Sequence, residues 1–311
     1  MVPDTEQHTI SFTQKNIMHI VLTGSLGNIS KPLAAALIQK GHAVTVISSH
    51  DDRKKEIEAL GGKAAIGSLE DAAFLTDTFR GADAVYVMVP PNYAVPDNRA
   101  YYNHIGQSYK TAIEKAGVKR VVQLSSFGAD LDKGTGPILG SHDVEAILDS
   151  IPGIAITHLR PASFYTNFYA FTDMIKQMGF IGSNYGGEDK LILVSPNDIA
   201  AVAAEELVAT APVQKVAYIA SDEKTATETA HILGRAIGKP DLQWLIFPDD
   251  KTRDSLVKNG LSEHMADNMV EMGHSMHTGE LRTDYEQHRP QQLGKTKLED
   301  FAREFAAAYG K

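Results

Sequence analysis

Residues 18–48 read MHIVLTGSLGNISKPLAAALIQKGHAVTVIS, and they contain two apolar runs separated by a glycine-containing turn and an amphipathic stretch. The runs at 19–23 and 43–48 are apolar on both faces of an extended chain, which is typical of strands in a parallel sheet covered by helices. Residues 31–40 carry apolar side chains at helical spacing, and Pro32 is tolerated in the first turn of a helix. This stretch therefore predicts a strand–helix–strand unit with parallel strands.

The same alternation continues along the first half of the chain. Further predicted strands lie at residues 63–66, 84–89, 120–125 and 154–159, and further predicted helices lie at 53–60, 72–79 and 101–116. This order predicts an α/β fold with a doubly wound parallel Rossmann sheet.

After residue 160 the regular alternation fails. Short apolar runs lie among helical segments at 191–194, 217–220 and 242–247. We expect residues 18–160 to form a Rossmann domain and residues 161–311 to form a smaller mixed α/β substrate region that completes the same globule. Residues 1–17 are polar and show no helical or strand period, so we expect a disordered leader or an extension that is not native to the chain.

Composition excludes several classes of protein. The 311 residues carry a formal net charge of -9, and nucleic-acid binding depends on concentrated Lys and Arg, so nucleic acid is not expected as a partner. The chain has no cysteine, which excludes disulfides and cysteine-ligated metals and is compatible with a reducing compartment. No apolar run reaches the ~18 residues typical of a membrane span. We expect a cytoplasmic monomer or homodimer that does not bind membranes.

The turn after the first predicted strand has the composition of a dinucleotide-binding loop. Gly24 can form the tight turn, and Gly27 lets backbone N–H groups approach a pyrophosphate at the N-terminus of the next helix, where the helix dipole favours an anion. The alternative is a glycine turn that binds no nucleotide, but the position between a strand and an amphipathic helix favours the first interpretation. The predicted contacts are Gly24, Ser25, Leu26, Gly27, Asn28 and Ile29.

Several segments carry recognisable motifs: TGSLGNIS (23–30), GSLED (67–71), ADAVYVMVPP (82–91), AGVKRVVQLSSFGA (116–129), ITHLRPASFYTNF (156–168) and SPNDIAAVAAEEL (195–207). In this order they resemble the NmrA-like proteins of the atypical short-chain dehydrogenase superfamily, and the resemblance extends from residue 19 to the C-terminus. It implies a Rossmann fold that binds NAD(P).

The adenosine end of the cofactor follows from the same pattern. Ser68 and Leu69 occupy the family's position near the adenine, where Ser68 replaces a frequent Asp. No carboxylate ends the second strand to bind a ribose 2'-hydroxyl. The side chains that could instead surround a 2'-phosphate are Ser48, Ser49, His50 and Arg53, although many NADP-binding members have Arg in place of Ser49. NADP(H) is therefore the expected cofactor, and NAD(H) held by Asp51 or Asp52 is the alternative.

Other strand ends mark the nicotinamide and substrate end of the site, because ligands bind at the carboxyl ends of parallel strands. The predicted cofactor contacts there are Val89, Pro90, Pro91, Ser125 and Ser126. The predicted walls of a pocket for a small-molecule substrate are Tyr93, Phe127, Phe164 and Asn167. For the aromatic residues, packing in the core is an equally good interpretation.

The helix after the fifth predicted strand lacks the Tyr–Lys pair that delivers protons in ordinary short-chain dehydrogenases. His142 is the natural proton donor in that segment, and Glu145 lies on the same helix face and could orient it. The alternative is a surface His142 and a structural Glu145. Two functions stay open: an NAD(P)H-dependent oxidoreductase that reduces a small carbonyl, quinone or conjugated substrate, or a non-catalytic NAD(P)-sensing regulator that acts through a protein partner.

Residues 264–277 combine histidines with methionines, and we interpret them as a packed helix. The methionines recur at helical spacing, as Met265, Met269, Met272 and Met276. The histidines lack a companion carboxylate at a known ligand spacing, so no metal site is expected.

Overall fold

The computed structural model describes residues 17–92, 94–209 and 215–310. Its centre is a seven-stranded sheet in the order β10-β6-β5-β4-β1-β2-β3, in which every strand pair is parallel. The strands are β1 (His19–Leu22), β2 (Ala43–Ser48), β3 (Lys63–Ile66), β4 (Ala84–Val87), β5 (Arg120–Leu124), β6 (Ala155–Pro161) and β10 (Val216–Ile219). Because β1 lies between β2 and β4, the chain winds outward in both directions, and the predicted fold class is confirmed.

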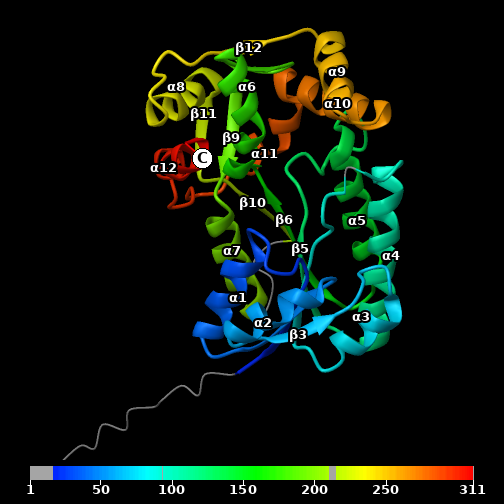
Figure 1. Ribbon diagram of the computed structural model, residues 1–311. Coiled ribbons are helices and arrows are strands. Elements are labelled where there is room, and N and C mark those ends of the chain that lie inside the picture. Colours follow the sequence, from blue (N-terminus) through cyan, green and yellow to red (C-terminus); the bar gives the residue numbers. More distant parts are fainter. Residues whose placement is uncertain (1–16, 93, 210–214, 311) are drawn as a thin grey trace, which may run out of the picture.

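Helices cover both faces of this sheet (Figure 1). The flanking elements are α1 (Ser30–Gln39), η1 (Asp51–Arg53), α2 (Lys54–Ala59), α3 (Ala72–Phe79), α4 (Asn98–Ala116), η2 (Gly136–Ile138), α5 (Leu139–Asp149) and α7 (Pro196–Val208). α1 and α7 pack together on one face, whereas α3, α4 and α5 cover the other. Strand residues such as Val21 and Tyr86 are fully buried as a result.

The C-terminal half contributes to the main sheet. β10 and α7 both follow residue 160, yet β10 pairs with β6 and α7 packs against α1. The run predicted at 217–220 as part of a substrate region is therefore the seventh strand of the main sheet. The main sheet extends beyond residue 160, because the chain builds other elements between β6 and β10 before it returns to the sheet.

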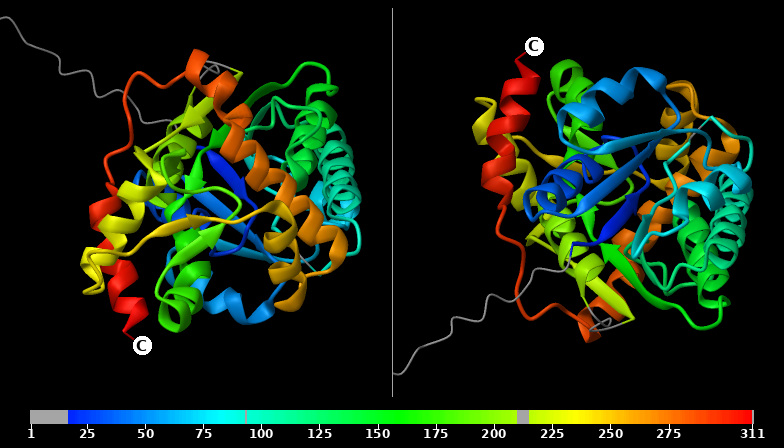
Figure 2. Two further views of the ribbon diagram at one scale, coloured as in Figure 1. Left: turned by 90° about the horizontal axis from the view of Figure 1, so that it is seen from above. Right: turned by 90° about the horizontal axis from the view of Figure 1, so that it is seen from below.

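The remaining elements gather at one end of the molecule (Figure 1). The strands there are β7 (Ser163–Phe164), β8 (Ile181–Ser183), β9 (Lys190–Val194), β11 (Asp222–Thr225) and β12 (Trp244–Ile246). The helices are η3 (Tyr165–Phe171), α6 (Thr172–Met178), α8 (Ala226–Ala236), α9 (Asp249–Lys258), α10 (Glu263–Thr278), η4 (Glu280–Arg282), α11 (Thr283–Gln287) and α12 (Leu298–Tyr309). Figure 2 shows α10 (orange) beside α4 and α5, with α12 (red) on the other side of the molecule.

α10 is anchored on the loop between β5 and α5. Glu271 accepts a hydrogen bond from the N–H of Gly136 at 3.1 Å, and the Ser275 hydroxyl donates to the carbonyl of Gly134. Met265 is fully buried and Met276 packs against an aromatic cluster, as the helical spacing predicts. Across the described residues, no helix is long and apolar enough to cross a membrane, and no cluster of side chains is arranged to hold a metal ion.

A buried ion pair fastens α7 to the sheet. Arg120 of β5 lies 2.6 Å from a carboxylate oxygen of Glu206 on α7, and it also donates to the Glu206 carbonyl. The same carboxylate accepts a hydrogen bond from Thr157 of β6 at 2.9 Å. Both charged residues are less than a tenth exposed, and burial lowers the pKa of Arg120. The pair therefore joins one helix to two neighbouring strands.

Replacing Glu206 by Ala should leave a buried guanidinium without its counter-charge. We expect a loss of about 3–5 kcal/mol in the free energy of unfolding, the usual cost of breaking a buried pair by removing one partner. Chemical denaturation measures this loss. Glu205→Ala is the matched control because Glu205 precedes it on the same helix and is exposed. Equal losses in the two variants would show that the Arg120–Glu206 pair makes no specific contribution to the free energy of unfolding.

Candidate functional site

The glycine turn lies where β1 and β4 are adjacent, at the carboxyl ends of the strands. Gly24 has a φ of +88° and Ser25 a φ of +53°, so the chain turns sharply as it leaves β1. A Cβ atom on Gly24 would lie 2.7 Å from the Ser30 hydroxyl oxygen. Glycine has no Cβ atom and so avoids this clash. Ser30 occupies the last position of the motif and donates to the carbonyl of Thr23 at 2.9 Å. The turn is therefore closed tightly against the start of α1.

This turn leaves backbone donors free for an anion. In the part of the chain that the structure describes, no backbone hydrogen bond takes the N–H of Leu26, Asn28 or Ile29, and α1 has no side-chain cap at its N-terminus. Gly27 and Asn28 are exposed. Free N–H groups at the start of a helix are what a pyrophosphate requires. The residues predicted from the sequence therefore fit the diphosphate of a dinucleotide.

The end of β2 approaches the same turn. Ser25 donates to the Ser48 hydroxyl at 3.0 Å, and the N–H of His50 donates to Ser48 at 3.2 Å. Ser48 is buried, and its hydroxyl fixes the turn through the hydrogen bond from Ser25. Ser49 and His50 are exposed beside it. Of the polar side chains predicted here, the structure brings Ser25 and Ser48 into direct contact.

Two cationic side chains follow in sequence the glycine turn and the end of β2. Arg53 of η1 pairs with Glu56 at 3.0 Å, and Lys31 in the first turn of α1 pairs with the other oxygen of Glu56 at 2.8 Å. Hydrogen bonds from Lys31 and Arg53 hold the pKa of Glu56 below its ordinary value. Lys31 was absent from the predicted site, because spacing along the chain does not show that α1 and α2 meet through Glu56.

The predicted adenine contacts follow β3, next to β2. Ser68 is exposed, and its hydroxyl accepts a hydrogen bond from the N–H of Glu70 at 3.1 Å. Leu69 is half-buried and packs against the cluster beneath α3 and α4. Both residues therefore lie at the same edge of the sheet as the end of β2.

The end of β4 is tied to the glycine turn. The N–H of Met88 donates to the Thr23 hydroxyl at 2.9 Å, and the Tyr109 hydroxyl of α4 donates to the carbonyl of Met88 at 2.6 Å. Val89 is buried, Pro90 is half-buried and Pro91 is exposed. The predicted pocket residue Tyr93 lies outside the described residues.

At the end of β5, Ser125 donates to Glu145 of α5 at 2.5 Å. Arg160 of β6 donates twice to the same carboxylate, at 2.7 and 3.0 Å. In the structure both Glu145 oxygens therefore contact Ser125 or Arg160, the structural role that was the alternative to orienting His142. The hydroxyl of Ser126 is directed to the carbonyl of Phe127 at 3.1 Å.

His142 is held by the backbone of the loop after β5. Its Nδ1 lies 2.9 Å from the carbonyl oxygen of Ala129. A carbonyl only accepts, so Nδ1 carries hydrogen and donates, and Nε2 is left to exchange a proton. His142 is half-buried in the first half of α5. The ring is thereby fixed at the same edge of the sheet as the glycine turn.

Of the predicted pocket walls, the two phenylalanines pack against a hydrophobic cluster and Asn167 is exposed. Phe127 packs against Tyr218 and Tyr285, with ring centroids 6.1 and 5.4 Å away. Phe164 is half-buried against the same hydrophobic cluster. Asn167 is exposed on η3, and its amide lies 3.4 Å from the Ser163 hydroxyl.

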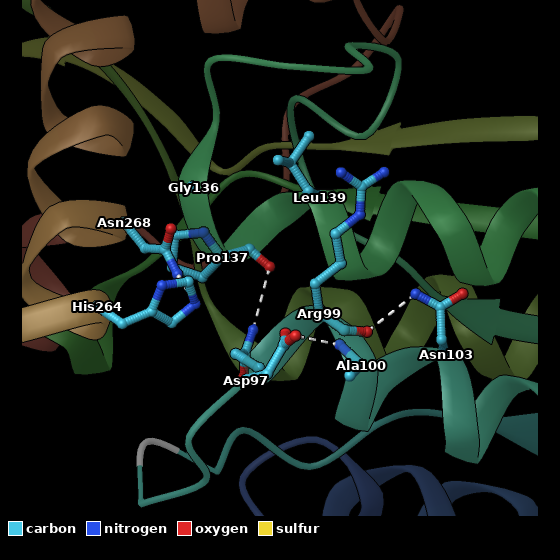
Figure 3. A pocket seen from close by; sticks show the side chains of 10 residues that line it. Asp97, Arg99, Ala100, Asn103, Gly136, Pro137, Leu139, His264 and Asn268 are labelled. Carbon is cyan, nitrogen blue, oxygen red and sulfur yellow. Dashed lines mark hydrogen bonds between the residues drawn. The ribbon is translucent and has the colours of Figure 1, made fainter. Parts of the chain in front are cut away.

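A cavity of about 480 Å³ opens beside the start of α5. Figure 3 shows side chains of α4 and of the start of α5 on one part of its wall and His264 and Asn268 of α10 on another. Leu139 also lines it, one helical turn before His142. The cavity joins segments that are far apart in the sequence, so no local motif signals it.

Known proteins resemble the chain over most of its length. An NAD(P)H azoreductase of Xenophilus azovorans is 25% identical over 256 residues, which is 81% of this chain and 85% of that protein. An NADPH-dependent quinone oxidoreductase from Escherichia coli, solved with NADPH, has a TM-score of 0.75 and 20% identity, with 92% of this chain and 99% of that one covered. A triphenylmethane reductase of Citrobacter gives the same TM-score and identity, with 93% and 99% covered. These structures share the fold.

Replacing Gly27 by Asp should place a carboxylate among the free N–H groups of the turn, where it repels a pyrophosphate. We expect NADPH binding to be lost in calorimetric titration. Gly27→Asn is the control, because it adds the same bulk without the charge and should retain part of the affinity. Undiminished binding in a folded Asp variant would place the diphosphate elsewhere.

A family model described as NAD(P)H-binding matches residues 24–210. The match begins at the glycine turn and includes the ends of β2, β4 and β5 and the whole of α5. The free N–H groups of the turn give that match a physical basis, and the resemblance to the NmrA-like proteins predicts the same ligand. The chain belongs to the NAD(P)H-binding family.

Proposed function

We propose that this protein is an NAD(P)H-dependent oxidoreductase that reduces a small carbonyl, quinone or conjugated substrate. The observation that carries the proposal is His142, a titratable ring fixed by a backbone carbonyl at the edge of the sheet where the glycine turn lies. Reduction of such a substrate requires a proton donor at this edge, whereas sensing of the dinucleotide does not. The similarity to an azoreductase and the shared fold with a quinone oxidoreductase and a triphenylmethane reductase support this reaction class.

The reaction needs a hydride for the carbon or nitrogen that is reduced and a proton for the atom that gains negative charge. NAD(P)H supplies the hydride when it is bound. The free N–H groups of the glycine turn would hold its diphosphate, and Val89 and Pro90, which follow β4 next to β5, would lie beside it. Because Nδ1 of His142 is hydrogen-bonded to Ala129, Nε2 is the atom from which the ring would deliver the proton.

The cofactor is proposed to be NADP(H) rather than NAD(H). Lys31 and Arg53 both pair with Glu56, so two cationic side chains meet at this corner, and Asp51 and Asp52 precede Arg53 in η1. A 2'-phosphate can accept charge-assisted hydrogen bonds from both cations, whereas a 2'-hydroxyl brings no charge to them. The exposed Ser49 and His50 add polar groups beside it.

Replacing Arg53 by Ala should weaken NADPH binding about tenfold more than NADH binding, because one charge-assisted hydrogen bond to the phosphate is lost. Lys31→Ala should act in the same direction. Arg80→Ala is the matched control: Arg80 is also exposed and paired with a neighbouring carboxylate, at the far end of α3. Equal losses for NADPH and NADH would contradict a 2'-phosphate site at this corner.

Replacing His142 by Phe should lower turnover about a hundredfold or more with little change in NADPH affinity, which is the usual scale for losing a general acid. NADPH oxidation is followed with a panel of quinones, enones, azo compounds and aldehydes. His104→Phe is the control, because His104 is an exposed histidine of α4. Full activity in the His142 variant would assign proton delivery to solvent or another side chain. NADPH binding without turnover of any panel compound would favour the sensing regulator instead.

A further inference from the structure

Five side chains form a continuous hydrogen-bonded chain from the end of β5 to the C-terminal region. They are Ser125, Glu145, Arg160, Tyr218 and Asp284, and we call them the Ser125–Asp284 chain. The first four are each less than a tenth exposed. They come from β5, α5, β6 and β10, whereas Asp284 lies on α11 with its side chain 29% exposed. A buried polar array of this length connects the cofactor edge with a distant part of the sequence.

Arg160 is the centre of the chain, and each of its nitrogen atoms has a partner. Nε and Nη2 donate to Glu145 at 3.0 and 2.7 Å. Nη1 donates to the Tyr218 hydroxyl at 3.1 Å and to Asp284 at 3.4 Å, and it lies 3.9 Å from Asp130. Because the guanidinium is planar and rigid, partners on all sides fix its orientation. That orientation in turn fixes the plane of the Glu145 carboxylate.

Tyr218 connects Arg160 to Asp284 in the C-terminal region. Its hydroxyl accepts from Arg160 and donates to Asp284 at 2.5 Å, which leaves Asp130 at 3.3 Å as the more distant oxygen. The direction of donation is therefore uniform, from Arg160 through Tyr218 to Asp284. Hydrogen bonds that follow one another in this way strengthen each other in a buried setting.

The other end of the chain decides what Ser125 can do. Arg160 can only donate and it donates to both oxygens of Glu145, so Glu145 is left to accept from Ser125, and the short 2.5 Å contact takes the single hydrogen of the Ser125 hydroxyl. Ser125 therefore has only lone pairs left for a ligand. A substrate carbonyl or quinone oxygen is itself an acceptor and gains nothing from them. An N–H or O–H group does.

We infer that Ser125 accepts a hydrogen bond from a donor group of the nicotinamide half of the cofactor, either its carboxamide N–H or a ribose hydroxyl, and that Asp284 is a positioning residue for this contact through Tyr218, Arg160 and Glu145. Ser126 does not replace Ser125 here, because its hydroxyl is directed to the Phe127 carbonyl. The inference rests on the proposed site for the cofactor, and it assigns the substrate's proton to a group other than Ser125.

Ser125→Ala tests the first half of the inference. Titration with NADPH alone, followed by calorimetry or cofactor fluorescence, should show a dissociation constant raised about tenfold, the scale of one lost hydrogen bond. Unchanged NADPH affinity in a folded Ser125→Ala variant would overturn the inference, because the cofactor would then make no hydrogen bond to Ser125.

Asp284→Ala tests the second half. It should raise the NADPH dissociation constant about threefold, and Asp284→Asn, which keeps an oxygen acceptor for Tyr218, should recover part of the loss. Glu286→Gln on the same helix is the control, because Glu286 is half-exposed and pairs with Arg282. If Asp284→Ala is unstable, Tyr218→Phe removes the link through the Tyr218 hydroxyl and leaves only the 3.4 Å contact of Arg160 with Asp284, so it should raise the dissociation constant in the same direction.

The double variant Ser125→Ala/Asp284→Ala separates positioning from general destabilisation. If Asp284 acts through Ser125, the double variant binds NADPH no more weakly than Ser125→Ala alone. Independent losses that multiply would overturn the positioning role. These titrations contain no substrate, so their outcome does not depend on whether the proposed reduction occurs.

Discussion

Thr23, which follows β1 directly, joins that strand to β4 and α1 beside the glycine turn. Its N–H donates to the carbonyl of Tyr86 in β4, and its hydroxyl accepts from the N–H of Met88 at the end of the same strand. Its carbonyl accepts from Ser30 in the first turn of α1. Thr23 is fully buried, so each of these bonds is protected from water. The glycine turn keeps its shape because the residue before it has every backbone and side-chain polar group engaged.

The C-terminal half contributes to the structure around the glycine turn in two ways. Part of it extends the sheet, since α7 is fastened by the Arg120–Glu206 pair and β10 adds the seventh strand. Another part covers the carboxyl edge, where α10 is anchored on the β5–α5 loop and α11 reaches Arg160. The two halves therefore form one structural unit, and residues near the C-terminus share a hydrogen-bonded array with Ser125.

Helical spacing alone does not identify the partners that Glu145 has in the structure. Residues three apart on a helix share a face, which is why His142 and Glu145 were expected to interact. In the folded chain, Glu145 turns towards the sheet, where Arg160 and Ser125 satisfy it, while His142 reaches the loop carbonyl of Ala129. A buried carboxylate needs a cation to compensate its charge. Here that cation is Arg160 of β6, and helical spacing alone does not show that β6 lies beside α5.

The sequence by itself determined the strand–helix alternation, the glycine turn and the NAD(P)-binding class, because these depend on periodicity and backbone conformation over short stretches. It also placed Ser125 and His142 at strand or helix ends where ligands bind. Tertiary structure decided the membership of β10 in the main sheet, the meeting of Lys31 with Arg53 at Glu56, and the partners of Glu145. Each of these is a contact between segments far apart along the chain, and such contacts are chosen by burial and charge compensation in three dimensions.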